Sequence, residues 1–206
     1  MYGAAVIVDG MAKTAKGALR ERLLAARRSV PDEIGADEAR SLAEHLEALV
    51  SSASTVCAYV PVGTEPGSIE MLDVVLRRGG RVLLPVARTT ADDSPVALQW
   101  GEYRPSQLVA ARFGLLEPAR PWLPATTLAE ASVVLVPALA VDRAGVRLGR
   151  GRGFYDRTLV HRDPRARLIA VIRDEELLDE LPCEPHDVLM THALTPRRGL
   201  IELGDT

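Results

Sequence analysis

Hydrophobic positions in the first quarter of the chain recur with helical spacing. Within residues 11–28 the apolar positions stand four and three apart, which predicts a helix with one buried stripe and its many arginines facing outward. The residues of this stripe are Leu19, Leu23 and Ala26. A second helix is expected over residues 31–50, because Pro31 suits a first helical turn and the leucines after it share one face. Residues 1–10 fit no element.

From residue 55 onward, short apolar runs alternate with helical segments. The runs typical of buried strands cover residues 55–60, 81–86, 96–100, 132–136, 168–172 and 188–190, and an edge strand is expected over 199–203. Helices are expected over Ile69–Arg78, capped by Ser68, and from about Phe154. Residues 102–124 show little periodicity. Continuous apolar strands separated by helices predict an α/β fold with a mainly parallel sheet and helices on both faces.

Composition fits one ordinary globular domain. The chain has 206 residues, of which 47% are hydrophobic and 26% charged, and it contains no repeat or linker. We therefore expect a tail over residues 1–12 and a single domain over 13–206. No stretch approaches the ~18 apolar residues of a membrane span, and the apolar start is too short for a signal peptide, so a cytoplasmic protein is expected. The two cysteines, Cys57 and Cys183, lack the spacing of a zinc site or disulfide framework.

Charge narrows the choice of partners. The formal net charge is −3, which argues against a dedicated nucleic-acid binder. Nearly all basic residues are arginines, and the only lysines are Lys13 and Lys16. Lys16 and Arg20 stand four residues apart, so they project from one helical face. Such a pair is usually solvated, and an anion contact is the alternative interpretation.

The densest chemical signal is a glycine- and arginine-rich loop over residues 142–153. Gly149, Gly151 and Gly153 alternate with Arg150 and Arg152, between the strongest apolar run and an expected helix. Glycines let backbone N–H groups approach a ligand, and the arginines and the helix N-terminus add positive charge. The loop therefore predicts an anion cradle, best suited to polyphosphate, although it has neither the Rossmann nor the Walker A spacing. A mobile basic surface loop and an RNA-contacting segment are the alternatives.

Two carboxylates accompany this loop. Asp156 falls just inside the expected helix, where a carboxylate also favours the helix dipole. Asp187 precedes the apolar run at 188–190. Beside a triphosphate either residue is a candidate Mg²⁺ ligand, because magnesium takes one or two carboxylates together with phosphate oxygens and water.

The glycine loop carries a resemblance to a known family. Residues 147–156, RLGRGRGFYD, resemble the signature RLGxGxGYYD of the 5-formyltetrahydrofolate cyclo-ligase family. Weaker similarities occur in the same order along the chain, in 16–20, at Glu65, and in 113–118, 136–142 and 182–191. The resemblance implies a Rossmann-like sheet related to the sugar-phosphate isomerase and CoA-transferase group.

The resemblance also implies a reaction. Members of this family use ATP and Mg²⁺ to convert 5-formyltetrahydrofolate to 5,10-methenyltetrahydrofolate, with release of ADP and phosphate. It implies small-molecule substrates, no nucleic acid or membrane partner, and a monomer. Two other functions stay open, a non-enzymatic nucleic-acid or regulatory binder and a sugar-phosphate isomerase-like enzyme. The acidic charge balance and the nucleotide elements at both ends of the chain disfavour both.

Site residues follow from the resemblance by position. Those implied to bind ATP are Lys16, Gly17, Ala18, Leu19, Arg20, Arg147, Leu148, Gly149, Arg150, Gly151, Arg152, Gly153, Phe154 and Tyr155. Those implied to line the folate pocket are Val62, Glu65, Gly67, Phe113, Arg150, Gly151, Arg152, Gly153 and Phe154. Arg150 and Tyr155 are the implied catalytic residues, and Asp156 and Asp187 the implied Mg²⁺ ligands. Phe154 replaces the first tyrosine of the signature, and Gly67 replaces an acidic residue.

Overall fold

A single large sheet organises the chain. The computed structural model describes residues 3–184 and 187–204, with side chains from residue 15 onward other than that of Phe113. The sheet has eight strands in the order β13-β12-β10-β7-β1-β2-β3-β6. Its parallel centre comprises β12 (His192–Thr195), β10 (Arg167–Val171), β7 (Val133–Pro137), β1 (Thr55–Cys57) and β2 (Arg81–Val86). The antiparallel strands at its edges are β13 (Gly199–Glu202), β3 (Gln99–Glu102) and β6 (Trp122–Leu123).

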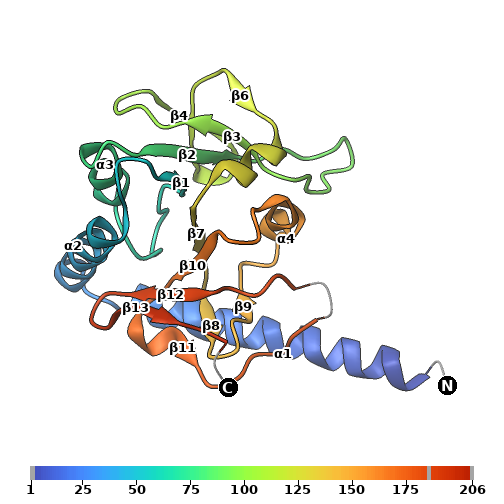
Figure 1. The fold of residues 1–206 in the computed structure, drawn as a ribbon. Coiled ribbons are helices and arrows are strands. Elements are labelled where there is room, and N and C mark those ends of the chain that lie inside the picture. Colours follow the sequence, from blue (N-terminus) through green and yellow to red (C-terminus); the bar gives the residue numbers. More distant parts are fainter. Residues whose placement is uncertain (1–2, 185–186, 205–206) are drawn as a thin grey trace.

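Helices cover both faces of this sheet, which confirms the predicted fold class. On one face lie α2 (Asp32–Leu49) and α3 (Glu70–Arg77), and on the other α4 (Phe154–Thr158) with the 3-10 turns η2 (Ala125–Glu130) and η3 (Leu159–His161) (Figure 1). The first face buries Leu42, Leu46 and Leu72 against the strands. The second buries Leu128 and Leu159.

Two predictions about the strands and loops need correction. The run at 188–190 forms no strand, because it packs against the turn at Gly145 instead of joining the sheet. The N–H of Met190 donates to the carbonyl of Gly145 at 2.8 Å, and β12 begins only at His192. The region 102–124 is more structured than its sequence indicated. It holds a hairpin of β4 (Leu108–Ala110) and β5 (Leu116–Pro118) around the turn η1 (Arg112–Gly114), followed by β6.

Helix α1 ends at Arg28 as predicted but differs from its prediction in its start and in its buried stripe. It runs over Gly3–Arg28, so the expectation that residues 1–10 belong to no element is wrong. Leu23 is buried as expected, but Ala26 is exposed and Arg27 takes its place in the stripe, only 2% exposed. Figure 1 shows α1 running beside a small sheet of β8 (Ala140–Asp142), β9 (Arg147–Leu148) and β11 (Leu177–Leu178). No helix in the described part of the chain is long and apolar enough to span a membrane.

Candidate active site

A cavity of about 410 Å³ opens where the central parallel strands end. Its walls include Val60 and Glu65 after β1, Pro85 and Ala87 around the end of β2, and residues 137–139 at the end of β7. Ligand sites in open α/β sheets lie at the carboxyl ends of the strands, and this cavity occupies that position. Because β1 lies between β7 and β2, the cavity has a β7 side, a middle at β1 and a β2 side.

Most of the site residues named from the sequence line this one cavity. They are Lys16, Arg20, Val62, Glu65, Arg147, Leu148, Gly149, Arg150, Gly151, Arg152, Gly153, Phe154, Tyr155, Asp156 and Asp187. Gly17, Ala18 and Leu19 do not line it, because the residues between two helix positions four apart turn away from their face. Leu19 packs instead against the apolar cluster around Leu23. The side chain of Phe113 lies outside the described part of the structure.

Gly67 also lies outside the cavity lining, and its own geometry explains why it is glycine. Its φ is +99°, a left-handed value that disfavours a side chain. A Cβ there would stand 2.4 Å from Sδ of Met71. An acidic residue at position 67 would therefore require this turn to move. The backbone conformation and the contact with Met71 explain why glycine stands where the family pattern has an acidic residue.

The glycine loop is anchored to α1 at Gly149, and at its other end the carbonyl of Gly153 accepts a hydrogen bond from Nη1 of Arg157 at 2.9 Å. Arg20 on α1 donates through Nε to the carbonyl of Gly149 at 2.9 Å. Gly151 and Gly153 have φ of +84° and +76°, so both adopt left-handed backbone. The helix that follows, α4, has only five residues, so the helix dipole contributes little and the loop's charge comes from its arginines. These contacts argue against the interpretation of a loose surface loop.

Lys16 is not on a solvated helix face. Its side chain is 12% exposed, and its Nζ lies 2.8 Å from Oε1 of Glu184 and 3.9 Å from Oδ2 of Asp187. The carboxylate of Asp187 also accepts the backbone N–H of Glu184 at 2.8 Å. Lys16 thus presents its charge to the cavity beside two carboxylates.

Arg147 forms the opposite part of the charged wall. Its Nη2 donates to Oδ1 of Asp156 at 2.5 Å, and its guanidinium carbon lies 5.5 Å from the centre of the Tyr155 ring. The arginine side chain is only 7% exposed, whereas that of Asp156 is 38% exposed. Arg147 lines the cavity, and its buried Nε has no hydrogen-bond partner among the described residues, so this arginine keeps one donor available for a ligand.

Glu65 and Arg150 meet in the middle of the cavity. Nε of Arg150 lies 3.1 Å from Oε1 of Glu65, while Oε2 of Glu65 accepts the N–H of Val62 at 3.1 Å. Glu65 is nearly buried and Arg150 is about half exposed. The pair therefore joins the loop after β1 to the glycine loop.

Tyr155 has a buried hydroxyl without a hydrogen-bond partner among the described residues. Burial raises the pKa of this phenol, and the neighbouring charge of Arg147 only partly opposes the effect. The phenol is consequently neutral near pH 7 and can act as a donor but not as a base. An unpaired buried hydroxyl is costly, and a bound ligand would relieve that cost.

Sequence reasoning missed the β2 side of the cavity. Its apolar lining consists of Val60, Pro85, Ala87, Leu98, Leu115 and Leu116. Apolar residues of this kind are indistinguishable in sequence from ordinary core residues. The one signal in the sequence was position, since Pro85 and Ala87 fall at the end of the strand predicted over 81–86.

The donor set suits Mg²⁺ held mainly by phosphate. No group of three or more His, Cys, Asp or Glu residues that could hold a metal exists in the described ranges. Asp156 and Asp187 nevertheless both line the cavity. Magnesium is commonly bound through one or two carboxylates plus substrate phosphates and water, and these two residues match that requirement.

Comparison with known proteins shows which family the chain belongs to. The sequence profile described as the 5-formyltetrahydrofolate cyclo-ligase family matches residues 12–196. The chain belongs to the 5-formyltetrahydrofolate cyclo-ligase family. A 5-formyltetrahydrofolate cyclo-ligase of Mycolicibacterium smegmatis is 62% identical over 193 residues, which is 94% of this chain and 100% of the relative. One of Escherichia coli is 30% identical over 151 residues, covering 72% of this chain and 81% of the relative.

Solved structures show the same fold. The 5,10-methenyltetrahydrofolate synthetase of Aquifex aeolicus matches with a TM-score of 0.68 at 23% identity, over 93% of this chain and 94% of that one. The synthetase of Mycoplasma pneumoniae matches with a TM-score of 0.61 at 18% identity, over 85% and 94%. The predictions of the cyclo-ligase family, of an enzyme and of the α/β fold are confirmed.

Proposed function

We propose that this chain converts 5-formyltetrahydrofolate to 5,10-methenyltetrahydrofolate, with ATP as the second substrate and ADP and phosphate as the other products. The observation that carries the proposal is one cavity with two different sides. Charged groups of α1 and the glycine loop line its β7 side, and apolar residues line its β2 side. A polyphosphate suits the first side and the flat pterin of a folate suits the second. This chain supplies every one of these residues, so the proposed reaction needs no residue from a second copy.

The chemistry requires the formyl oxygen to become a leaving group. In the proposed reaction this oxygen attacks the γ-phosphorus of ATP, a new O–P bond forms, and the bond to ADP breaks. N10 of the folate then attacks the formyl carbon to close the ring and gives up its proton to water, and the C–O bond breaks as phosphate departs with the formyl oxygen. Catalysis of this kind depends on alignment of the two substrates and on stabilisation of phosphoryl charge.

We assign Arg150 a role toward both substrates. It comes from the glycine loop of the β7 side, and its Nε pairs with Glu65 in the middle of the cavity. There its guanidinium can stabilise charge on the transferring phosphoryl group, where preorganised donors have their largest effect. Tyr155 adds a neutral donor from the same wall. Lys16, Arg20 and Arg147 hold the remaining phosphate oxygens.

Mg²⁺ would be held by Asp156, Asp187 and the phosphates of ATP, and when bound it neutralises phosphate charge. The arrangement favours such an ion because Glu184 and Asp187 stand beside Lys16, so a polyphosphate at this wall meets carboxylates as well as cations. A divalent cation between the two sets of oxygens relieves their repulsion.

The proposal is tested by product formation from purified components. With 5-formyltetrahydrofolate, ATP and Mg²⁺ together, we expect the absorbance of methenyltetrahydrofolate to rise and one ADP to appear for each product molecule. Omission of ATP should abolish both signals. Product formation without ATP, or ATP hydrolysis without the folate product, would contradict the proposed reaction.

The magnesium assignment has its own test in Asp156→Asn. This variant should need a higher Mg²⁺ concentration for half-maximal rate and recover part of its activity as Mg²⁺ rises, since a carboxylate ligand has been lost. Asp179→Asn is the matched control, because Asp179 is fully exposed and does not line the cavity. A magnesium titration of Asp156→Asn equal to that of the parent would contradict the assignment.

A further inference from the structure

Arg27 is a buried arginine on α1 that the proposed reaction does not use. It lies on the same helical stripe as Lys16, Arg20 and Leu23, because successive members stand four, three and four residues apart. The residue is only 2% exposed. Burial of a guanidinium is costly unless its donors are paired, so its contacts identify what it holds.

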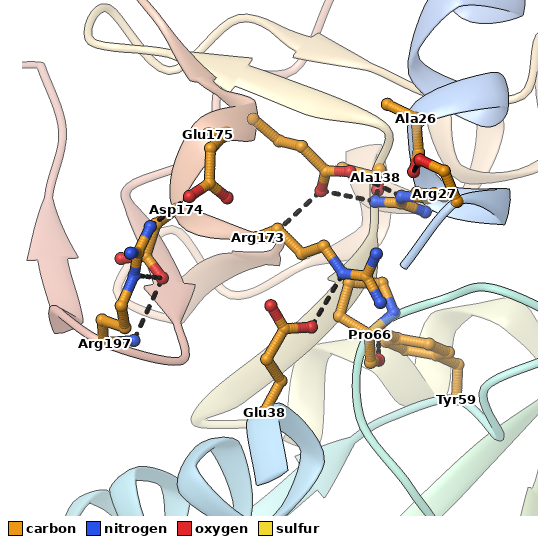
Figure 2. Close-up of polar contacts among 12 residues, drawn as sticks. Ala26, Arg27, Glu38, Tyr59, Pro66, Ala138, Arg173, Asp174, Glu175 and Arg197 are labelled. Carbon is orange, nitrogen blue, oxygen red and sulfur yellow. Dashed lines mark hydrogen bonds and ion pairs between the residues drawn. The ribbon is translucent and has the colours of Figure 1, made fainter. Parts of the chain in front are cut away.

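Those contacts tie α1 to two other segments. Nε of Arg27 donates to Oε1 of Glu176 at 2.6 Å, and Nη2 donates to Oε2 of Glu176 at 2.7 Å. Nη2 also donates to the carbonyl of Ala138 at 2.6 Å, a contact visible in Figure 2. Glu176 lies in the 3-10 turn η4 (Asp174–Glu176), and its Oε2 accepts the backbone N–H of Arg173 at 2.8 Å. The backbone of this turn therefore holds the Glu176 carboxylate independently of Arg27.

The helix has few other buried anchors. Among the described side chains of α1, residues 15–28, only Leu23 and Arg27 are buried. Leu23 packs on Leu139 and Leu148, an apolar contact that can slide. Arg27 supplies the directional contact, because a bidentate pair fixes both the orientation and the position of the guanidinium.

Arg27 and Arg20 attach α1 to two segments that are also hydrogen-bonded to each other. Arg27 donates to the carbonyl of Ala138. The N–H of the next residue, Leu139, donates to the carbonyl of Leu148 at 2.8 Å. The residue after Leu148 is Gly149, whose carbonyl accepts Nε of Arg20. Arg20 and Arg27 are seven residues apart, or about 10 Å along the helix. Two attachments at that separation fix both the rotation of α1 and its position along its axis.

We propose that Arg27 is a positioning residue that registers α1 against the glycine loop, and so places Lys16 and Arg20 for the polyphosphate. The inference rests on the proposed function, because it takes the phosphates of ATP as the ligand of those two cations. Arg27 lines the cavity, but its Nε and Nη2 are engaged by Glu176 and Ala138, so the positioning role needs no contact between Arg27 and ATP. Its effect reaches the nucleotide through the helix and through the segment Ala138–Leu139.

The main test variant removes both members of the pair, as Arg27→Met with Glu176→Met. Loss of Arg27 alone would leave the Glu176 carboxylate buried without its partner and threaten folding, whereas replacement of both by apolar residues is well tolerated in buried ion pairs. Calorimetric titration should show ATP binding weakened ~10-fold, about the value of one charged contact. Binding of 5-formyltetrahydrofolate in the absence of ATP should be unchanged. Arg28→Met, an exposed neighbour on the same helix, should match the parent.

A second background distinguishes positioning from general destabilisation. When Lys16 and Arg20 are both replaced by alanine, the further change at Arg27 and Glu176 should weaken ATP binding no more, because nothing is left to position. An equal further loss in that background, or an equal loss of folate affinity in the parent background, overturns the proposal. Glu176→Gln keeps the shape of the side chain and should change ATP binding in the same direction by less. Glu176→Gln takes the place of the double variant in this test if the double variant does not fold.

Hydrogen exchange of the ligand-free protein separates this proposal from the proposed function. Backbone amides of residues 15–28 should exchange faster in the double variant and at the parental rate in Arg28→Met. If the parent does not bind ATP, the proposed function fails, yet exchange still decides whether Arg27 fixes the helix. Unchanged exchange in residues 15–28 overturns the positioning role.

Discussion

The β7 side of the cavity presents charged groups of α1 and the glycine loop, whereas the β2 side presents apolar side chains. On the β7 side Lys16, Arg20 and Arg147 each have a polar partner between 2.5 and 2.9 Å away. On the β2 side the lining is apolar, and the charged pair nearest to it in sequence, Arg88 with Glu117, contributes neither member to the cavity wall. One cavity therefore offers directional anion contacts at one side and a shape for an uncharged ring system at the other.

This difference teaches how one small domain keeps two substrates apart and yet in contact. Charged groups disfavour an uncharged ring system on the β7 side, because covering them with such a ring would remove their hydration without supplying an opposite charge. Apolar residues exclude a polyphosphate from the β2 side for the converse reason. The two ligands are then forced to meet in the middle, where Glu65 pairs with Arg150.

The largest effect is expected at that meeting point. Arg150→Ala should lower kcat by ~10²-fold or more, because its charge acts on the phosphoryl group during transfer. Arg143→Ala is the control, since Arg143 is an exposed arginine of the same loop region that does not line the cavity. A parental kcat in Arg150→Ala would contradict the account, because it would show that phosphoryl transfer does not depend on the arginine in the middle of the cavity.

Lys16→Ala should separate the two sides. The KM for ATP should rise about 10-fold or more, the value of a charged hydrogen bond, while the KM for folate changes little. Arg22→Ala, on the exposed face of the same helix, should leave both constants unchanged. Equal increases in both KM values would show that Lys16 supports the whole site and not its nucleotide side.

Glu65→Gln should have its main effect on folate. The amide can still accept the N–H of Val62 but loses the charge that pairs with Arg150, so we expect the KM for folate to rise ~10-fold. Steady-state kinetics with each substrate varied in turn measures the split, with exposed Glu70→Gln as the control. A larger change in the KM for ATP would place Glu65 on the nucleotide side and contradict the division proposed here.

The smallest effect is expected for Tyr155→Phe. Removal of an unpaired buried hydroxyl should raise the melting temperature, and loss of a neutral donor to the substrates should lower kcat by about 2–10-fold. Tyr103→Phe should show the reverse, a lower melting temperature with unchanged kcat. The Tyr103 hydroxyl donates to Asp73 at 2.8 Å, and neither residue lines the cavity. Unchanged kcat in Tyr155→Phe would show that the hydroxyl does not contact the substrates.

Elements with a local cause were predicted well from the sequence. The strand over 81–86 has the bounds of β2, because its continuous apolar run is buried on both faces. The run at 188–190 has similar composition but forms no strand, since its backbone bonds to Gly145, a residue distant in sequence. Local pattern alone cannot distinguish a sheet partner from a turn partner.

The same distinction applies to the site. The glycine loop places its groups within one continuous segment, so its motif identified much of the β7 side. The β2 side gathers Pro85, Leu98 and Leu115 from separate segments, and no local pattern marks them. Arg27 was expected to face outward because its partner, Glu176, is 149 residues away. A buried arginine is recognised only when that partner is seen.

The transfer of the formyl oxygen tests the central claim most directly. If both substrates meet at Arg150 and ATP phosphorylates the formyl group, 5-formyltetrahydrofolate labelled with ¹⁸O at the formyl oxygen should release inorganic phosphate that carries one ¹⁸O atom for each product molecule. Mass spectrometry of the phosphate from a single turnover measures this label. Unlabelled phosphate would show that ATP is cleaved without bonding to the formyl oxygen, and would contradict the account of one cavity that aligns the two substrates.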